Sequence, residues 1–303
     1  MTAALIALAA LLAADPPKPS TLGPKLEAIA ATHKGKIAIG VKHLATGEEF
    51  FLRGDDVMPT ASLIKAAVMV ETFRLFETRK FNFDHKLTLT KDDTVPGAGV
   101  LTDSFSPGAT FSLLDAVRLM ITVSDNTATN MVLDTITIPA TNATMAKLGF
   151  PETRINAKVF KGSTTSVDPE RTKKYGLGST TAREMTGLFE LIATRKAVSP
   201  TASDEMLGIL KKNHDNEMLV RGFPTGTDFA HKTGAVTAAR TDAGVLYFGG
   251  KPAVVICVLT DENADKRWLI DNDAQLVISK VGRAVYDHYA PPPAPAKAEP
   301  PKK

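Results

Sequence analysis

The stretch TASLIKAAVMVETFRL, Thr60–Leu75, sets a serine and a lysine three residues apart at the head of an otherwise apolar run. Apart from Lys65, the residues from Leu63 to Val70 leave almost no polar face, which predicts a buried and central helix. Thr60 or Ser62 is available to cap its N-terminus. Because residues three apart lie on one side of a helix, Ser62 and Lys65 are expected to point into the same patch, where they can touch.

The charge at Lys65 has two readings. A buried, unpaired ammonium is strongly disfavoured, so burial would lower the pKa of Lys65 from about 10.4 and let its amine act as a base for the Ser62 hydroxyl. Alternatively, Ser62 is an ordinary helix cap and Lys65 extends its ammonium to water along an apolar surface. A lone Ser-x-x-Lys pattern does not decide between the two.

The composition bounds the classes of function. With 303 residues, 44% hydrophobic and 23% charged, the chain is long enough for one large domain or two lobes sharing a core. The net charge of +3 and the lack of a basic run argue against a nucleic-acid partner. Cys257, the sole cysteine, lies in the apolar segment AVVICVL, which predicts a buried strand thiol. The six histidines lack zinc-ligand spacings, so we expect no metal ion and no other cofactor.

The two ends of the chain differ from the rest. Residues 1–20, MTAALIALAALLAADPPKPS, hold an apolar stretch too short to span a bilayer, followed by small residues and prolines, which is typical of an export signal. No lysine or arginine precedes the apolar part, so a start further upstream or an ordinary hydrophobic helix is the alternative. We expect an exported, periplasmic or extracellular monomer without an integral membrane span. Residues 290–303, rich in Pro, Ala and Lys, predict a disordered tail.

The order of predicted elements is strands, helices, strands. A first helix in residues 22–34 precedes a hairpin at 36–52 that turns at Thr46-Gly47, and strands return over 228–260 before a closing helix at 274–290. Between them we expect helices over residues 60–75, 112–123, 127–136, 140–149 and 181–193.

This order predicts an α/β fold of the two-lobed α+β kind. One antiparallel sheet built from both chain ends would be covered on one side by the terminal helices and packed against an all-helical lobe. The predicted domain spans residues 21–289, with a sheet lobe at 21–60 and 225–289 and a helical lobe at 61–224. We expect the functional site in the cleft between the lobes.

Two further short motifs bear on Ser62 and Lys65. VSDN places Ser124, Asp125 and Asn126 just past an amphipathic helix, and HKTG places Lys232, Thr233 and Gly234 on a returning strand. Each alone is usually a cap or a strand end. In this order, however, Ser-x-x-Lys, Ser-Asp-Asn and Lys-Thr-Gly are the motif set of penicillin-interacting serine enzymes. From about Leu22 to Tyr289 the chain resembles the class A β-lactamase and penicillin-binding protein superfamily.

The resemblance implies a role for each matching residue. Ser62 would attack a cyclic amide to form an acyl-enzyme, and Lys65, Ser124 and Lys232 would share the proton transfers. Two lysines near one serine would lower each other's pKa and create a field that suits an anionic substrate. Asn126 would donate to an amide of the substrate side chain, and Thr233 and Arg240 would bind the substrate carboxylate. The backbone N–H groups of Ser62 and Ala235 would stabilise the oxyanion. Gly234 would allow a close approach of the strand.

For Arg240 and for His231, a structural role is an alternative to a catalytic or binding role. The register of Arg240 after Lys-Thr-Gly is uncertain, so a surface role is an equal alternative. His231 precedes Lys232, and strand alternation points it away from the Lys232 side, which favours a structural or supporting role over that of a base.

The family pattern breaks at the loop that should carry Glu-x-x-x-Asn, which activates the deacylating water in class A β-lactamases. Lys158 or Val159 falls where the glutamate should be, and neither can act as a carboxylate base. Asp168 or Glu170, further along a lengthened loop, could fold back to hold the water. The neighbouring Arg171, Lys173 and Lys174 make a solvated charge cluster the alternative.

Three functions therefore stay open, each with a small molecule as partner. The first is a serine β-lactamase that hydrolyses the β-lactam amide through Ser62, with Glu170 ahead of Asp168 as the base. The second is a related peptidase or esterase acting on D-Ala-D-Ala substrates. The third is a penicillin-binding sensor without turnover.

Overall fold

The computed structural model describes residues 21–292 of the chain. The predicted export signal, residues 1–20, and residues 293–303 of the predicted tail lie outside the described residues. Within the described part, no helix combines the length and the apolar character needed to cross a membrane.

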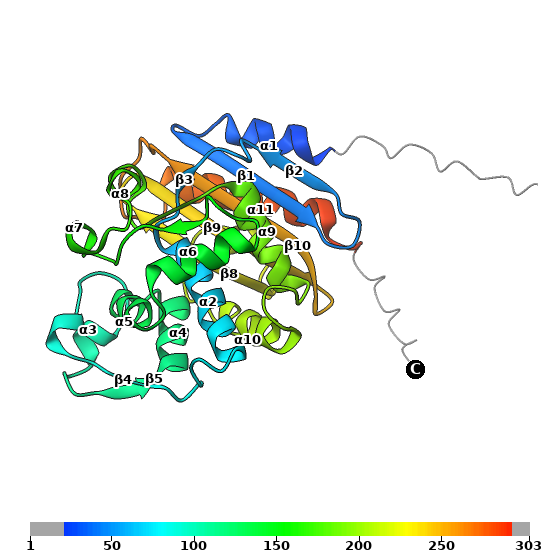
Figure 1. Ribbon diagram of the computed structural model, residues 1–303. Coiled ribbons are helices and arrows are strands. Elements are labelled where there is room, and N and C mark those ends of the chain that lie inside the picture. The colour runs from blue at the N-terminus through cyan, green and yellow to red at the C-terminus, as the bar shows by residue number, and fades with distance from the viewer. Residues whose placement is uncertain (1–20, 293–303) are drawn as a thin grey trace, which may run out of the picture.

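A five-stranded sheet forms the framework, in the order β2-β1-β10-β9-β8, with every neighbouring pair antiparallel (Figure 1). It contains β1 (Lys36–His43) and β2 (Glu49–Leu52) from the N-terminal hairpin, and β8 (Phe229–Val236), β9 (Ala239–Phe248) and β10 (Lys251–Asp261) from the C-terminal part. β1 pairs with β10 from Lys36 opposite Asp261 to His43 opposite Val254. The prediction of one antiparallel sheet built from both chain ends is confirmed.

The two faces of the sheet carry different cores because successive strand residues point to opposite sides. In β10, Val254, Ile256 and Val258 pack with the terminal helices α1 (Leu22–Ala30) and α11 (Asp273–Tyr289). Val255, Cys257 and Leu259 face α9 (Ala182–Ala193) and the helical lobe instead. Cys257 is the buried strand thiol that was predicted, and burial raises its pKa.

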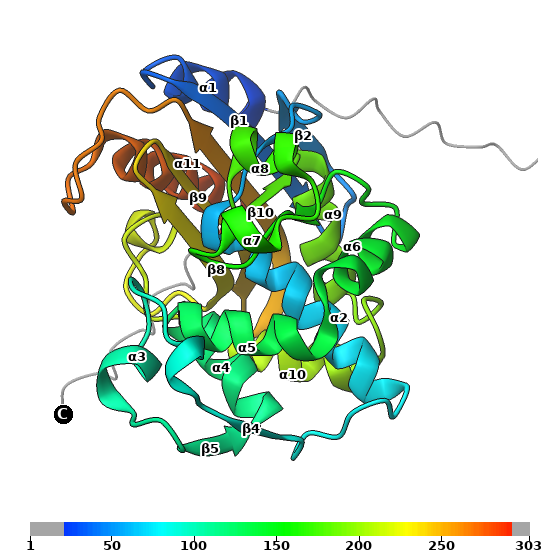
Figure 2. The same cartoon turned by 60° about the vertical axis from the view of Figure 1, so that its left-hand side comes forward.

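The helical lobe surrounds α2 (Lys65–Glu77), which runs through the middle of the molecule from the sheet (Figure 2). Eleven residues of α2 are buried, as its nearly continuous apolar sequence predicts. Its neighbours are α4 (Leu113–Thr122), α5 (Asn126–Ile136), α6 (Ile138–Lys147) and α10 (Pro200–Leu210). α10 was not predicted, although Ser199 caps it and Pro200 begins it, two signals that usually mark a helix start.

Short elements complete the fold. Apart from the 3-10 turn at 61–64, which lies within the helix expected over residues 60–75, none of them was predicted. Segments of two to four residues carry no readable periodicity, and tertiary contacts form them. They are the sheets β3-β7-β6 (Met58–Pro59, Gly178–Thr180, Arg154–Ile155) and β4-β5 (Lys86–Thr88, Thr110–Ser112), the helices α3 (Leu101–Ser104), α7 (Gly162–Thr165) and the slightly longer α8 (Pro169–Tyr175), and the 3-10 turns η1 (Ala61–Ile64), η2 (Lys91–Asp93) and η3 (Val220–Gly222).

A buried carboxylate fixes α2 to α6. The Glu71 side chain has no exposed surface, and its oxygens accept hydrogen bonds from Arg74 at 2.7 and 2.8 Å and from the Thr144 hydroxyl at 2.6 Å. A buried charge is tolerated only when it is paired and hydrogen-bonded in this way.

We predict that Arg74→Met destabilises the protein by about 3 kcal/mol, because it leaves the Glu71 carboxylate buried without its cation. Arg118→Met is the matched control, since Arg118 and Asp115 form the same i,i+3 pair with about half of each side chain exposed. The control should cost less than about 1 kcal/mol. Urea unfolding measures both, and equal losses would contradict this account of the Glu71 site.

Candidate active site

Ser62 lies on a tight 3-10 turn and not on the α-helix itself. η1 spans Ala61–Ile64, and α2 begins at Lys65. Neither Thr60 nor Ser62 caps a helix through its side chain, so the predicted cap is wrong. Ala61 has a positive φ of 46°, an unfavourable conformation for alanine that the surrounding contacts maintain. The turn presents Ser62 to solvent, while its neighbours are buried.

Lys65 is fully buried, which excludes the alternative that its ammonium extends to water. Its Nζ donates to the Ser124 carbonyl at 2.7 Å, to Ser124 Oγ at 3.2 Å and to Asn126 Oδ1 at 3.0 Å. Burial lowers the pKa of Lys65 well below its usual value, the Lys232 charge lowers it further, and Asp125 acts in the opposite direction. No bond from Lys65 to Ser62 Oγ is present among the hydrogen bonds of the described residues, so Ser124 is the hydroxyl that Lys65 contacts directly.

The Ser-Asp-Asn segment is fixed from several sides. Ser124 has a positive φ of 56°. Asp125 caps α5 by accepting from Ala128 N at 2.8 Å, and its second oxygen accepts from Val100 N at 2.7 Å. Asn126 donates from Nδ2 to the Pro96 carbonyl at 3.0 Å, which leaves one N–H of that amide for a ligand.

Lys232 is the second buried lysine, with its Nζ donating to the Thr233 carbonyl at 2.7 Å. Burial lowers the pKa of Lys232 to about 8, and the negative charges of Asp215 and Asp242 act to raise it. At neutral pH most of this lysine is therefore protonated. Its charge lies directly beneath the strand residue Thr233.

Gly234 allows β8 to approach η1 closely. A Cβ at this position would lie 2.3 Å from the Thr60 carbonyl oxygen and 2.8 Å from Leu63 N. Both distances are shorter than real contacts, so only glycine fits without a shift of the backbone. Gly234 thus brings the Lys-Thr-Gly strand alongside the turn that carries Ser62.

His231 forms a buried pair with Asp242 on the neighbouring strand, Nδ1 to Oδ1, at 2.9 Å. The other Asp242 oxygen accepts from Leu219 N at 3.0 Å. Burial raises the pKa of the Asp242 carboxyl, and His231 acts in the opposite direction. His231 is not among the residues that line the cavity beside Ser62, a placement that fits the structural reading.

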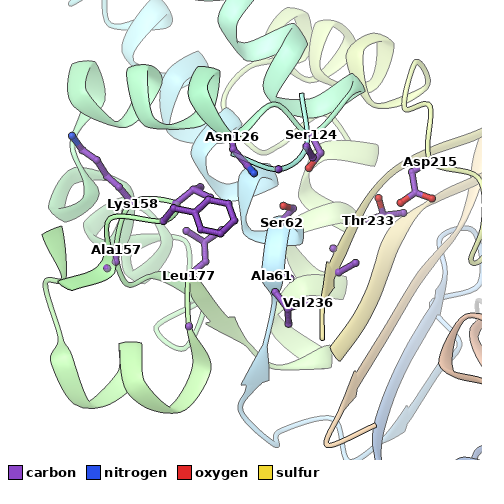
Figure 3. Close-up of a pocket in the computed structure, with 18 of the residues that line it drawn as sticks. Ala61, Ser62, Ser124, Asn126, Ala157, Lys158, Leu177, Asp215, Thr233 and Val236 are labelled. Carbon is purple, nitrogen blue, oxygen red and sulfur yellow. The ribbon is translucent and has the colours of Figure 1, made fainter. Parts of the chain in front are cut away.

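A cavity of about 560 Å³ joins these segments (Figure 3). Ser62, Ser124, Asn126, Thr233, Gly234 and Ala235, all predicted site residues, line it. Thr233 lies at one end, near Asp215, and Lys158 lies at the opposite end. Lys65 and Lys232 lie buried behind the lining, so the cavity has hydroxyl, amide and backbone groups at its surface and two lysines behind them.

The wall contributed by the loop after β6 is mostly apolar. Ala157, Val159, Phe160 and Leu177 line it. The side-chain amide of Asn130 binds the main chain of Val159 on both sides, accepting from Val159 N at 2.8 Å and donating to its carbonyl at 3.0 Å. Lys158, the neighbouring residue, forms an ion pair with Asp134.

Neither predicted carboxylate base lines this cavity. Asp168 caps α8, with its Oδ1 accepting from Arg171 N at 3.0 Å, and Glu170 is exposed in the first turn of that helix. Among the lining residues that the structure describes, Asp215 is the sole acid, and it comes from a different loop. The carboxylate that would activate a deacylating water is therefore missing from the wall formed by Val159.

Arg240 lies outside the lining of the cavity and is almost completely buried, which is not the surface position that was the alternative. Its guanidinium donates to the carbonyls of Val236, of Ala239 at 3.0 Å and of Arg267 at 3.1 Å. These contacts hold the β8-β9 turn against the loop before α11. The guanidinium is thus engaged by main-chain carbonyls.

Asn130, Asp215 and Trp268 were not identified from the sequence. Asn130 follows Asn126 by one helical turn, and this spacing could have placed it on the same face of α5. Asp215 and Trp268 lie in irregular loops without a motif, and only the fold brings them to the cavity.

Comparisons with known proteins agree with this geometry. The chain matches the beta-lactamase enzyme family over residues 21–289. It is 22% identical over 276 residues to the β-lactamase BRO-1 of Moraxella catarrhalis, covering 88% of this chain and 85% of that protein. The crystal structure of a β-lactamase from Sphaerobacter thermophilus has a TM-score of 0.76 at 24% identity, with coverage of 90% and 98%.

A second solved structure is that of PBP-A. It has a TM-score of 0.76 at 26% identity and covers 90% of this chain and 97% of its own. A variant of PBP-A has been solved as an acyl-enzyme complex with penicillin G. The two-lobed fold predicted from the sequence is thereby confirmed, with structural relatives that align over nearly their whole length.

We predict that Gly234→Ala destabilises the protein by about 1–3 kcal/mol, because the added methyl forces β8 away from η1. Gly208→Ala is the control: a Cβ there meets nothing within 4 Å, and alanine in helix α10 should stabilise by up to about 1 kcal/mol. Urea unfolding of the two variants tests this. Equal stability of Gly234→Ala and the unmodified protein would refute the close approach.

Proposed function

The chain belongs to the beta-lactamase enzyme family, and we propose that it is a serine hydrolase that opens cyclic amides of the β-lactam type through an acyl-enzyme on Ser62. One observation carries the proposal. Lys65 is fully buried and hydrogen-bonded to Ser124, and Ser124 lines the same cavity as Ser62.

In the acylation step, Ser62 Oγ attacks the amide carbonyl carbon. The amide C–N bond breaks, an ester to Ser62 forms, and the hydroxyl proton ends on the leaving nitrogen. The lowered pKa of Lys65 favours a neutral amine, which would accept this proton once its Nζ turns from Ser124 towards Ser62. Because Ser124 Oγ lies 3.2 Å from Lys65 Nζ and also lines the cavity, we assign it the transfer to the leaving nitrogen.

The other end of the cavity suits an anion. The Lys232 ammonium lies behind Thr233, so a substrate carboxylate can accept from the Thr233 hydroxyl within the field of that charge. We assign the developing oxyanion to the backbone N–H groups of Ser62 and Ala235, which both line the cavity. The unused N–H of Asn126 is available to the amide of the acyl side chain.

Deacylation is expected to be the slower of the two steps. Water must attack the ester carbonyl, break the bond to Ser62 and return a proton to its oxygen. General-base help is typically worth about a hundredfold to ten-thousandfold, and the wall formed by Val159 supplies no carboxylate. We therefore propose that the acyl-enzyme forms readily and hydrolyses slowly.

A second candidate is a peptidase or esterase acting on D-Ala-D-Ala substrates. The apolar wall at Val159 favours it, because an enzyme that does not depend on rapid β-lactam hydrolysis does not need a carboxylate there. A penicillin-binding sensor without turnover would be the limiting case of the same slow deacylation.

Export of a monomeric enzyme to the periplasm or the outside of the cell is part of the proposal. The export rests on the composition of residues 1–20.

We predict that a chromogenic cephalosporin leaves an adduct on Ser62 that persists for minutes, visible by intact-protein mass spectrometry and by peptide mapping. Ser62→Ala should abolish the adduct, and Ser106→Ala, at an exposed serine in a loop, should not affect it. Turnover of a D-Ala-D-Ala ester in the same preparation would favour the second candidate. If no covalent adduct forms, the proposal is wrong.

We predict that Val159→Glu shortens the lifetime of the adduct by about a hundredfold or more, because it places a carboxylate in the wall of the cavity. Val167→Glu is the control, since Val167 belongs to the same loop but is 44% exposed and does not line the cavity. Stopped-flow acylation and mass-spectrometric decay separate the two steps. An unchanged adduct lifetime in a folded Val159→Glu variant would remove this position from deacylation.

A further inference from the structure

A recess of about 330 Å³ lies beside the cavity that contains Ser62. The two spaces share Asp215, Ala235 and Trp268 as lining residues, so they are neighbours. Arg240, Glu217 and Gln275 also line the recess, together with apolar side chains of Met218, Leu269 and Ile270. The recess therefore begins at the end of the cavity where Thr233 lies.

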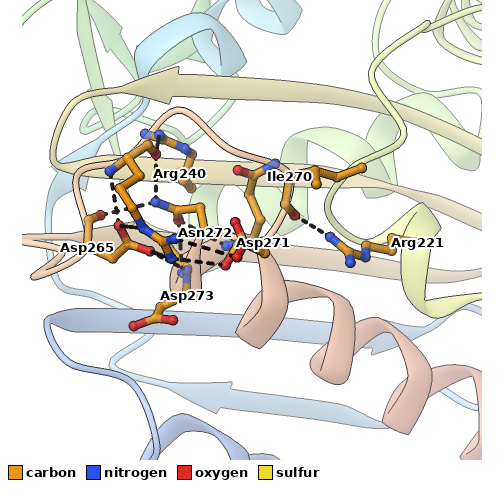
Figure 4. Close-up of polar contacts among 10 residues, drawn as sticks. Arg221, Arg240, Asp265, Ile270, Asp271, Asn272 and Asp273 are labelled. Carbon is orange, nitrogen blue, oxygen red and sulfur yellow. Dashed lines mark hydrogen bonds and ion pairs between the residues drawn. The ribbon is translucent and has the colours of Figure 1, made fainter.

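The loop that carries Trp268 is held in place by its own polar contacts (Figure 4). Arg267 binds the Asp265 carboxylate at 2.8 and 3.0 Å, and the Asn272 amide donates to the carbonyls of Asp265 and Arg267 at 3.1 and 2.9 Å. From outside the loop, Arg240 and Arg221 donate to the carbonyls of Arg267 and Ile270. The wall of the recess is thus preorganised without a ligand.

The charges that the recess exposes are acidic, because the two lysines and the arginine near it are buried. Lys65 and Lys232 are buried behind the lining of the main cavity. Arg240 gives its guanidinium hydrogens to main-chain carbonyls. Asp215 and Glu217 are both partly exposed, so they provide the accessible charge at this end.

Trp268 adds an aromatic face to this acidic surface. Its indole packs on the Arg240 guanidinium at 4.4 Å, and 64% of the residue is exposed. Trp268 and Asp215 also both line the main cavity. A carboxylate and an exposed indole in the lining of one recess are a combination that attracts organic cations.

We propose that Asp215 and Trp268 form a specificity subsite for a cationic group on the leaving-group side of the substrate. This inference rests on the proposed function, in which Asn126 faces the acyl side chain and Thr233 faces the leaving group and its carboxylate. The favoured substrate is then zwitterionic on that side: its carboxylate binds at Thr233, and an ammonium or pyridinium group enters the recess.

The alternative is that Asp215 acts only through Lys232, whose pKa it helps to raise. That effect would be the same for every carboxylate-bearing substrate, whether or not a cation is present. A matched pair of substrates therefore separates the two roles.

The test uses two cephalosporins with the same acyl side chain, one with a pyridinium group and one with a neutral acetoxy group on the C3 methylene. The second-order rate constant of Ser62 acylation is measured for each cephalosporin. The ratio of the cationic to the neutral rate constant is then compared between each variant and the unmodified protein, so that the different intrinsic reactivities of the two cephalosporins cancel. We expect Asp215→Asn to lower this ratio about tenfold and Trp268→Leu to lower it about threefold.

Asp103→Asn controls for the change in net charge, because Asp103 is exposed and does not line either space. It should leave the ratio unchanged. If Asp215→Asn slows both cephalosporins equally, the subsite is refuted while the proposed function stands. If neither cephalosporin acylates Ser62 in the unmodified protein, the proposed function fails and this inference fails with it.

Discussion

The burial of Lys65 is the constraint on which the site depends. An ammonium without exposed surface must be satisfied by protein groups, and Ser124 and Asn126 provide all three of its acceptors. This requirement joins the start of α2 to the start of α5, two segments about sixty residues apart. The same burial lowers the pKa of Lys65, so one placement both joins these segments and shifts the amine towards its neutral form.

The sheet supplies the third segment of the site. Its alternating strands separate a core beneath α1 and α11 from a core shared with the helical lobe, and β8 forms the edge next to η1. At that edge Gly234 lets the strand come within contact of the Thr60 and Leu63 backbone. The cavity thus forms where a sheet edge, a 3-10 turn and a helix start meet.

The sequence predicted those parts of the molecule that carry a long pattern. The three C-terminal strands and most helices were found because periodicity extends over eight or more residues. The hairpin at 36–52 was found because two alternating segments flank the Thr46-Gly47 turn. The pairings β3-β7-β6 and β4-β5 were missed because each depends on contacts between distant short segments.

The candidate site was also predicted only where a sequence pattern marks its residues. Ordered motifs placed Ser62, Ser124, Asn126 and Thr233 together, and they line one cavity. The motifs could not show that Asp168 would be used as the cap of α8 or that Arg240 would turn to main-chain carbonyls, because both outcomes depend on local backbone geometry. Asp215 and Trp268 lacked any pattern, and only the folded loops reveal them.

Lys232 has a consequence for the surroundings in which the protein can work. With a pKa of about 8, this lysine is about half charged at pH 8 and about one-tenth charged at pH 9. The positive charge behind Thr233 therefore decreases gradually over mildly alkaline pH. Burial lowers the pKa of Lys232, and the negative charges of Asp215 and Asp242 act to raise it, so these two acids extend to higher pH the range in which the lysine stays charged.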